Sequence, residues 1–200
     1  MAPKVLLIAC GALARELVLL MEQNGWQHLK IQCLPAELHN TPEKIPAAVV
    51  AAVERYRNEF GHIFVAYADC GTGGLLDKAL APHGVERLPG AHCYEFFTGA
   101  TAFAAFCDAE PGTFYLTDFL VRHFERLVIR GLGLDRHPEL KNEYFRHYAR
   151  VVYLAQSRSG ALSQLAMAHA DYLGLPCTEH FTGLEPVNRV LREQSIRWQN

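Results

Sequence analysis

Residues 4–25 decide the fold, and they read KVLLIACGALARELVLLMEQNG. The apolar run at 4–9 is typical of a buried strand, and Cys10 and Gly11 follow it as a turn. From residue 12 to residue 24 apolar side chains recur at helical spacing until Gly25, a residue type that commonly ends helices. The stretch therefore predicts a strand, a tight turn and an amphipathic helix.

The same order of strand, turn and helix recurs along the rest of the chain. Helical segments of about 10 to 15 residues separate most of the apolar runs, which is typical of right-handed crossovers in a parallel sheet. We therefore expect an α/β fold with a mainly parallel sheet and helices on both faces, a Rossmann-like three-layer sandwich. No linker, low-complexity run or fixed-period repeat interrupts the pattern, so we expect a single α/β domain over residues 1–200. Further strands are predicted at 29–34, 62–66, 85–88, 112–116, 151–155 and 178–181.

Composition narrows the class of protein. Hydrophobic residues make up 50% of the 200 residues and charged residues 20%, as in folded proteins rather than disordered ones. The 19 basic and 21 acidic residues give a net charge of -2, which provides no positive field for nucleic acid. The apolar runs are far shorter than the ~20 residues that cross a bilayer, and the N-terminus lacks a signal peptide's long apolar core. We therefore expect a cytoplasmic protein that acts on a small molecule and binds neither nucleic acid nor membrane.

The residues with reactive side chains follow the predicted strands. In parallel sheets ligands bind beyond the carboxyl ends of the strands, because helix N-termini and loop amides converge there. We therefore expect one carboxyl edge to gather residues that are far apart in the sequence. These residues are Cys10, His39, Asp69, Cys70, His92, Cys93, Asp118 and Gln156.

The turn after the third predicted strand, D-C-G-T-G-G at 69–74, is unusually rich in glycine. Glycine allows positive φ and a close approach to a ligand, so Gly71, Thr72, Gly73 and Gly74 are predicted to bind an anionic group through their amides. The start of a helix also lowers the pKa of a thiol, which favours Cys70 as a reactive residue. The pattern is neither a dinucleotide fingerprint nor a P-loop. The alternative is a tight turn around a small buried cysteine.

Three thiols and an imidazole at one edge match the ligand set of Zn²⁺ or iron. The six cysteines are spread through the chain, which favours reduced thiols over a disulfide framework. No C-x-x-C or H-E-x-x-H motif is present, so this prediction depends on the strands bringing the residues together. Each of these cysteines has core packing as its alternative role. The predicted metal ligands are Cys10, Cys70, Cys93 and His39, with His92 as an alternative imidazole.

Several long motifs occur in an order that resembles a bacterial and archaeal family known only as a domain of unknown function. They are IACGALARE at 8–16, LPAELHN at 34–40, YADCGTGGLLD at 67–77, GAHCYEF at 90–96, GTFYLTDFLVRHF at 112–124 and VYLAQ at 152–156. The resemblance covers nearly the whole chain, although Ala68 stands where the family has glycine. Members are often encoded near corrinoid-dependent methyltransferases, which implies one-carbon or methyl-group chemistry. The D-x-H-x-x-G signature of corrinoid binding is missing, so the resemblance implies an accessory role more than a corrinoid site.

Three functions remain open at this point, and whether the protein is an enzyme remains open with them. The first is a Zn- or Fe-dependent enzyme, a transferase or a hydrolase or lyase, that acts on a small anionic substrate with Asp69 and Asp118 orienting ligands or moving protons. The second is a metal-free enzyme with Cys70 as nucleophile and His92 or His39 as base. The third is a binding or accessory protein of a corrinoid methyltransferase system.

Overall fold

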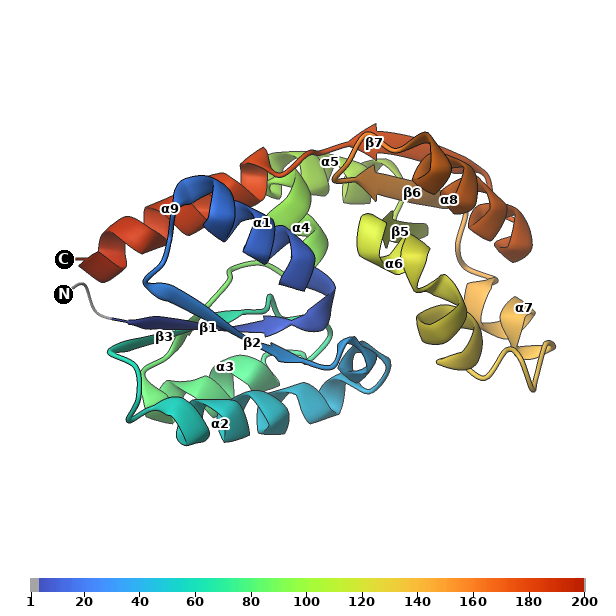
Figure 1. Cartoon of the computed structure of the whole chain (residues 1–200). Coiled ribbons are helices and arrows are strands. Elements are labelled where there is room, and N and C mark those ends of the chain that lie inside the picture. The colour runs from blue at the N-terminus through green and yellow to red at the C-terminus, as the bar shows by residue number, and fades with distance from the viewer. Residues whose placement is uncertain (1–3, 200) are drawn as a thin grey trace. The chain divides into compact units, whose positions relative to one another are not determined.

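The strands predicted from the sequence form, and they pair into two all-parallel sheets among residues 4–199, the part of the chain that the structure describes. This structure is a computed structural model (Figure 1). The α/β class is confirmed, and the strands divide between a sheet of order β2-β1-β3-β4 and a sheet of order β5-β6-β7. The strands are β1 Val5–Cys10, β2 Leu29–Leu34, β3 His62–Ala66, β4 Glu86–Arg87, β5 Thr113–Thr117, β6 Arg150–Ala155 and β7 Cys177–Phe181.

Helices connect the strands. None of the helices within residues 4–199 is both long and apolar enough to cross a membrane. The α-helices are α1 Ala14–Asn24, α2 Ile45–Tyr56, α3 Leu75–Leu80, α4 Cys93–Thr98, α5 Ala100–Ala109, α6 Asp118–Arg122, α7 Leu140–Phe145, α8 Gly160–Leu173 and α9 Glu185–Gln199. The shorter turns are η1 Gly11–Leu13, η2 Ala36–Asn40, η3 Pro42–Lys44, η4 Ala81–His83 and the π-helical η5 Glu125–Arg130.

The chain divides by its contacts into two compact units. The first consists of Met1–Phe96 and Val187–Asn200, and the second of Phe97–Pro186. Each unit contains one of the two sheets, so the predicted site residues that follow the strands are divided between two carboxyl edges. Whether the two units fold together as a single domain over residues 1–200 stays a prediction.

The first unit is built around β1, whose six residues are all buried. A run without polar side chains is typical of a parallel strand that is covered on both faces. Figure 1 shows α1 and α9 on one side of this sheet and α2 and α3 on the other. Trp198 of α9 packs against Phe64 of β3 with ring centroids 5.3 Å apart, and Arg192 donates to Asn24 at the end of α1. The predicted three-layer arrangement is thus present in this unit.

The strands of the first sheet run in the same direction, so they end at a common edge. Val5 of β1 pairs with Leu29 of β2 and with His62 of β3, which brings the three strands to nearly the same level. The carboxyl edge of this sheet therefore holds Cys10 at the end of β1, η2 after β2 and the loop at 67–74 after β3.

The second unit packs its helices around β6, the middle strand of its sheet. Val151 and Ala155 of this strand are fully buried and pack with Ala166 of α8. The helix α8 begins where Ser159 accepts a hydrogen bond from the Leu162 amide, and it ends at Gly174, whose φ is 74°. This sheet has its own carboxyl edge, which follows β5 and β6.

Candidate metal centre

Three of the predicted ligands come together at the carboxyl edge of the first sheet. One potential ligand atom from each of His39, Cys70 and Cys93 lies within 4.8 Å of those from the other two. The two sulfur atoms of Cys70 and Cys93 are 3.2 Å apart. His39 comes from η2, Cys70 from the loop after β3, and Cys93 from the first residue of α4. The group is therefore assembled by the fold and not by a local sequence motif.

The backbone holds Cys70 in an unusual conformation. Its φ is 51°, and among residues 4–199 it is the one residue other than glycine with a positive φ. The left-handed region is unfavourable by about 1–2 kcal/mol for a residue that carries a Cβ. The Cys70 amide donates to the Ala91 carbonyl at 2.8 Å, and the Asp69 amide donates to the Gly90 carbonyl at 3.1 Å. These two hydrogen bonds join the loop that carries Cys70 to the segment just before Cys93.

The predicted anion-binding turn contains an anion of its own. The Asp69 carboxylate accepts hydrogen bonds from Thr72 Oγ1 at 2.7 Å, the Gly73 amide at 2.9 Å and the Gly74 amide at 2.8 Å. The Thr72 amide donates to the Asp69 carbonyl at 3.1 Å. Burial opposes ionisation of Asp69, but the donors in this turn lower the pKa of its carboxyl. Three of the four predicted amides, all but that of Gly71, thus donate to Asp69, and binding of an external anion there stays a prediction.

His39 lies between Tyr67 and Cys10. Its ring stacks on the Tyr67 ring with centroids 5.9 Å apart and an angle of 12° between the planes. Its Nδ1 is 3.2 Å from the Ala36 carbonyl oxygen and 3.7 Å from Cys10 Sγ. Burial lowers the pKa of this imidazole, but the neighbouring Cys10 and Cys93 outweigh it and raise the pKa to about 10.

Cys10 lies beside the group of three and is not part of it. The side chain is buried, and its sulfur accepts a hydrogen bond from the Ala12 amide at 3.3 Å. It contacts the group through His39, whose Nδ1 is 3.7 Å from the Cys10 sulfur. The structure therefore brings the predicted set of four together as three grouped residues and one neighbour.

The two paired thiols differ in acidity. The contact with Cys93 and burial both raise the pKa of Cys70. The contact with Cys70 lowers the pKa of Cys93 well below its ordinary value, burial opposes this, and His39 lowers it further. The sequence pattern favours a lowered pKa at Cys70. Because either sulfur can be the donor in the 3.2 Å contact, the lowered pKa belongs to the pair of Cys70 and Cys93, next to which His39 lies.

Tyr67 belongs to this edge, although its residue type gives no such indication. The side chain is fully buried at the end of the apolar run that forms β3. Its hydroxyl has no hydrogen-bond partner among the described residues. A tyrosine next to an apolar strand is indistinguishable from a core residue in the sequence, and the one signal was its place three residues before Cys70.

Two predicted catalytic residues are not members of the group of three. His92 is exposed, next to Cys93 in the chain. Asp118 lies in the second unit, where it is buried at the start of α6. Its carboxylate accepts from Tyr153 Oη at 2.7 Å, from the Gln156 amide at 3.0 Å and from Ser157 Oγ. Asp118 and Gln156 therefore form a network at the carboxyl edge of the second sheet.

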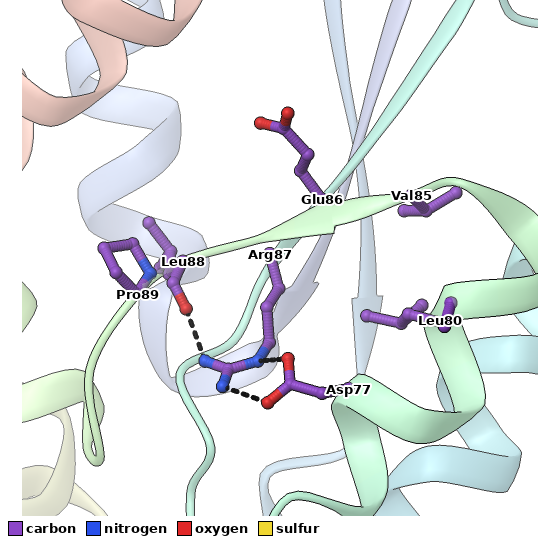
Figure 2. Close-up of a pocket in the computed structure, with 8 residues that line it drawn as sticks. Asp77, Leu80, Val85, Glu86, Arg87, Leu88 and Pro89 are labelled. Carbon is purple, nitrogen blue, oxygen red and sulfur yellow. Dashed lines mark hydrogen bonds and ion pairs between the residues drawn. The ribbon is translucent and has the colours of Figure 1, made fainter.

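A pocket of about 350 Å³ in the first unit borders the segment that leads to Cys93 (Figure 2). Arg87 forms an ion pair with Asp77, with Nε–Oδ1 and Nη2–Oδ2 distances of 2.6 and 2.7 Å, and also donates to the Leu88 carbonyl at 2.6 Å. The same guanidinium contacts the Gly90 carbonyl at 3.4 Å. Arg87 thus anchors the loop before Cys93. The lining residues are Asp77, Leu80, Ala81, Val85, Glu86, Arg87, Leu88 and Pro89.

Comparison with known proteins adds the family. No curated protein and no solved structure matches the chain. One family model matches residues 33–191, a range that includes His39, Cys70 and Cys93 but not Cys10. The chain therefore belongs to the family described as "Protein of unknown function (DUF1638)".

Proposed function

We propose that the protein is a metal-dependent enzyme in which His39, Cys70 and Cys93 hold a Zn²⁺ or iron ion. The observation that supports this most strongly is the convergence of one imidazole and two thiols within 4.8 Å. Thiolate and imidazole ligands select zinc and iron, whereas magnesium and calcium take oxygen ligands. In a tetrahedral zinc site two thiolates at about 2.3 Å from the ion are about 3.8 Å apart, so the 3.2 Å sulfur pair needs to open by about half an ångström.

The surroundings of His39 agree with a ligand role. A metal-bound histidine almost always donates its other ring N–H to a carbonyl, carboxylate or water. The Ala36 carbonyl is 3.2 Å from Nδ1, and a hydrogen on Nδ1 leaves the lone pair that a metal needs on Nε2. Metal binding also requires thiolates and a neutral imidazole. The lowered pKa of Cys93 favours the thiolate, whereas the raised pKa of His39 means that an ion must displace the imidazole proton.

Three protein ligands leave a fourth position for water or substrate, as in catalytic zinc sites. An ion with an open position polarises a bound group and lowers the pKa of bound water. The charge of the ion favours a small anionic substrate, which is the class that we propose. A role in one-carbon or methyl-group metabolism is supported by the family resemblance alone.

A metal-free cysteine enzyme is the second candidate, because one thiol of the pair is unusually acidic. In this alternative the nucleophile is a thiolate shared between Cys70 and Cys93, with His39 beside the pair.

Metal content of anaerobically purified protein tests the proposal. We expect about one zinc or iron per chain in the wild-type protein and a large loss of metal in Cys70→Ser and in Cys93→Ser. Cys177→Ser is the matched control, since this cysteine lies in β7 of the second unit. Its metal content should equal that of the wild type.

A folded wild-type protein without metal that also fails to take up added Zn²⁺ or Fe²⁺ contradicts the proposal. Rapid alkylation of Cys93 in that protein would support the cysteine enzyme instead.

A further inference from the structure

We propose that the fourth position at the metal takes a small anion and that Tyr67 binds this anion by donating a hydrogen bond from its hydroxyl. The inference rests on the proposed metal site and its anionic ligand class, and it adds the residue that recognises the ligand. Tyr67 then acts as a binding residue, and the ligand would lie between the ion and the phenol.

The first observation is the hydroxyl itself. The Tyr67 side chain has no exposed surface, and its Oη has no hydrogen-bond partner among residues 4–199. Burying a hydroxyl without a partner is unfavourable, and buried polar groups in folded proteins are nearly always paired. The buried tyrosine of the second unit, Tyr153, follows the rule, because its hydroxyl donates to Asp118 at 2.7 Å. An unpaired Tyr67 hydroxyl thus indicates that a partner arrives with a ligand.

The second observation is the position of this hydroxyl among the metal-binding side chains. The ring of Tyr67 stacks on that of His39, and the residue lies in the same loop as Cys70. The stack on His39 places the phenol beside one of the three proposed ligands.

The chemistry of the two partners sets the ligand class. A phenol donates one hydrogen bond, so the atom it meets needs a lone pair that the metal does not use. A hydroxide, a carboxylate oxygen, an azide nitrogen or a thiolate sulfur meets this need, and a cation or a hydrocarbon does not. A negative ligand is also favoured by the ion, and hydrogen bonds to charged acceptors are the stronger ones.

The cobalt-loaded full-length protein tests the inference, with azide as the probe. Co²⁺ takes the place of zinc and reports ligand binding by its visible absorption, so the dissociation constant of azide can be measured directly. We expect Tyr67→Phe to bind cobalt as the wild type does and to bind azide about tenfold more weakly, the loss typical of one hydrogen bond to a charged group. Tyr56→Phe is the control, because Tyr56 donates to Gln32 at 2.8 Å outside the group, and its azide affinity should not change.

Each result has a distinct meaning. Equal azide affinity in Tyr67→Phe and wild type overturns the inference and leaves the metal site in place. Cobalt binding without any azide effect in the wild type also overturns it, because the fourth position is then filled by the protein. Failure to bind cobalt, zinc or iron overturns the proposed function itself. Tyr67→Phe keeps the ring and removes an unpaired atom, so this variant should fold.

Discussion

The unpaired Tyr67 hydroxyl makes an unusual prediction about stability: removing it should not harm the metal-free protein. In most proteins a buried Tyr→Phe change removes a hydrogen bond and destabilises the fold. Here the hydroxyl has no partner among the described residues, so Tyr67→Phe removes only an unsatisfied polar atom. The penalty for such an atom is about 1–3 kcal/mol. We therefore expect the free energy of unfolding to stay the same or to rise by about 1 kcal/mol.

Tyr56→Phe supplies the comparison within the same unit. Its hydroxyl donates to Gln32 Oε1 at 2.8 Å, and such a neutral hydrogen bond contributes about 0.5–1.5 kcal/mol. The two variants differ by the same oxygen atom, so their unfolding free energies should differ by about 1–2 kcal/mol, with Tyr67→Phe the more stable. Urea denaturation of reduced, chelator-treated protein, followed by circular dichroism and linear extrapolation, measures this difference.

The difference between the two variants should nearly disappear when cobalt and saturating azide are added. A ligand stabilises the folded state in proportion to the logarithm of its concentration over its dissociation constant, so tenfold weaker azide binding lowers the gain of Tyr67→Phe by about 1.4 kcal/mol. A metal-free Tyr67→Phe protein that is destabilised as much as Tyr56→Phe would refute the reasoning, because the hydroxyl would then have a partner in the chain.

Three further changes should have measurable effects. Tyr153→Phe removes the 2.7 Å hydrogen bond to the buried Asp118 carboxylate, and we expect the second unit to lose about 1.5–3 kcal/mol in thermal or urea denaturation; an unchanged transition would contradict this. In metal-free protein the sulfurs of Cys70 and Cys93, 3.2 Å apart, should form a disulfide when diamide accepts their two electrons and two protons, and bound zinc should prevent this oxidation. Peptide mass spectrometry detects the disulfide, and equal oxidation with and without zinc would oppose a shared site. Burial lowers the pKa of His169 below its ordinary value, so the unfolded chain takes up a proton at this residue before the folded protein does. Stability should therefore fall as the pH drops from about 6.5 toward the lowered pKa, and His169→Gln should flatten this part of a stability-against-pH curve. An unchanged curve would show that this residue does not contribute.

The strands were predictable because each is a short apolar run that ends at a polar or glycine-containing turn. The run HIFVA at 62–66 forms β3 with the predicted bounds. The division into two sheets was not predictable, because periodicity gives the length and burial of a strand but not its neighbours. Strand β5 has the same kind of pattern as β1, yet β5 pairs with β6 in a separate sheet.

The same reasoning explains which site residues were found. His39, Cys70 and Cys93 follow β2, β3 and β4, which belong to one sheet, and the rule for parallel strands brings them together. Asp118 also follows a strand, but its strand belongs to the other sheet. Sequence alone gives no reason to separate Asp118 from the other three.

The aspartate at the start of the glycine-rich turn is a sequence signal for hydrogen bonds within the turn itself. An aspartate at the start of a turn commonly accepts hydrogen bonds from amides a few residues later in the chain. Asp69 does this for Gly73 and Gly74. An external anion and the turn's own carboxylate would compete for the same amides. The carboxylate has the entropic advantage because it is already attached to the turn.

The three grouped side chains come from loops that are far apart in the sequence, at positions 39, 70 and 93. An unfolded chain would have to close two long loops to chelate an ion, so tight binding requires that β2, β3 and β4 have already joined β1 in one sheet. Metal affinity should then report how fully the strands of the first sheet have paired, and an ion that binds would cross-link the three loops. If the proposed ion is removed, this edge should loosen first, while the second unit, which has its own core, should keep its stability.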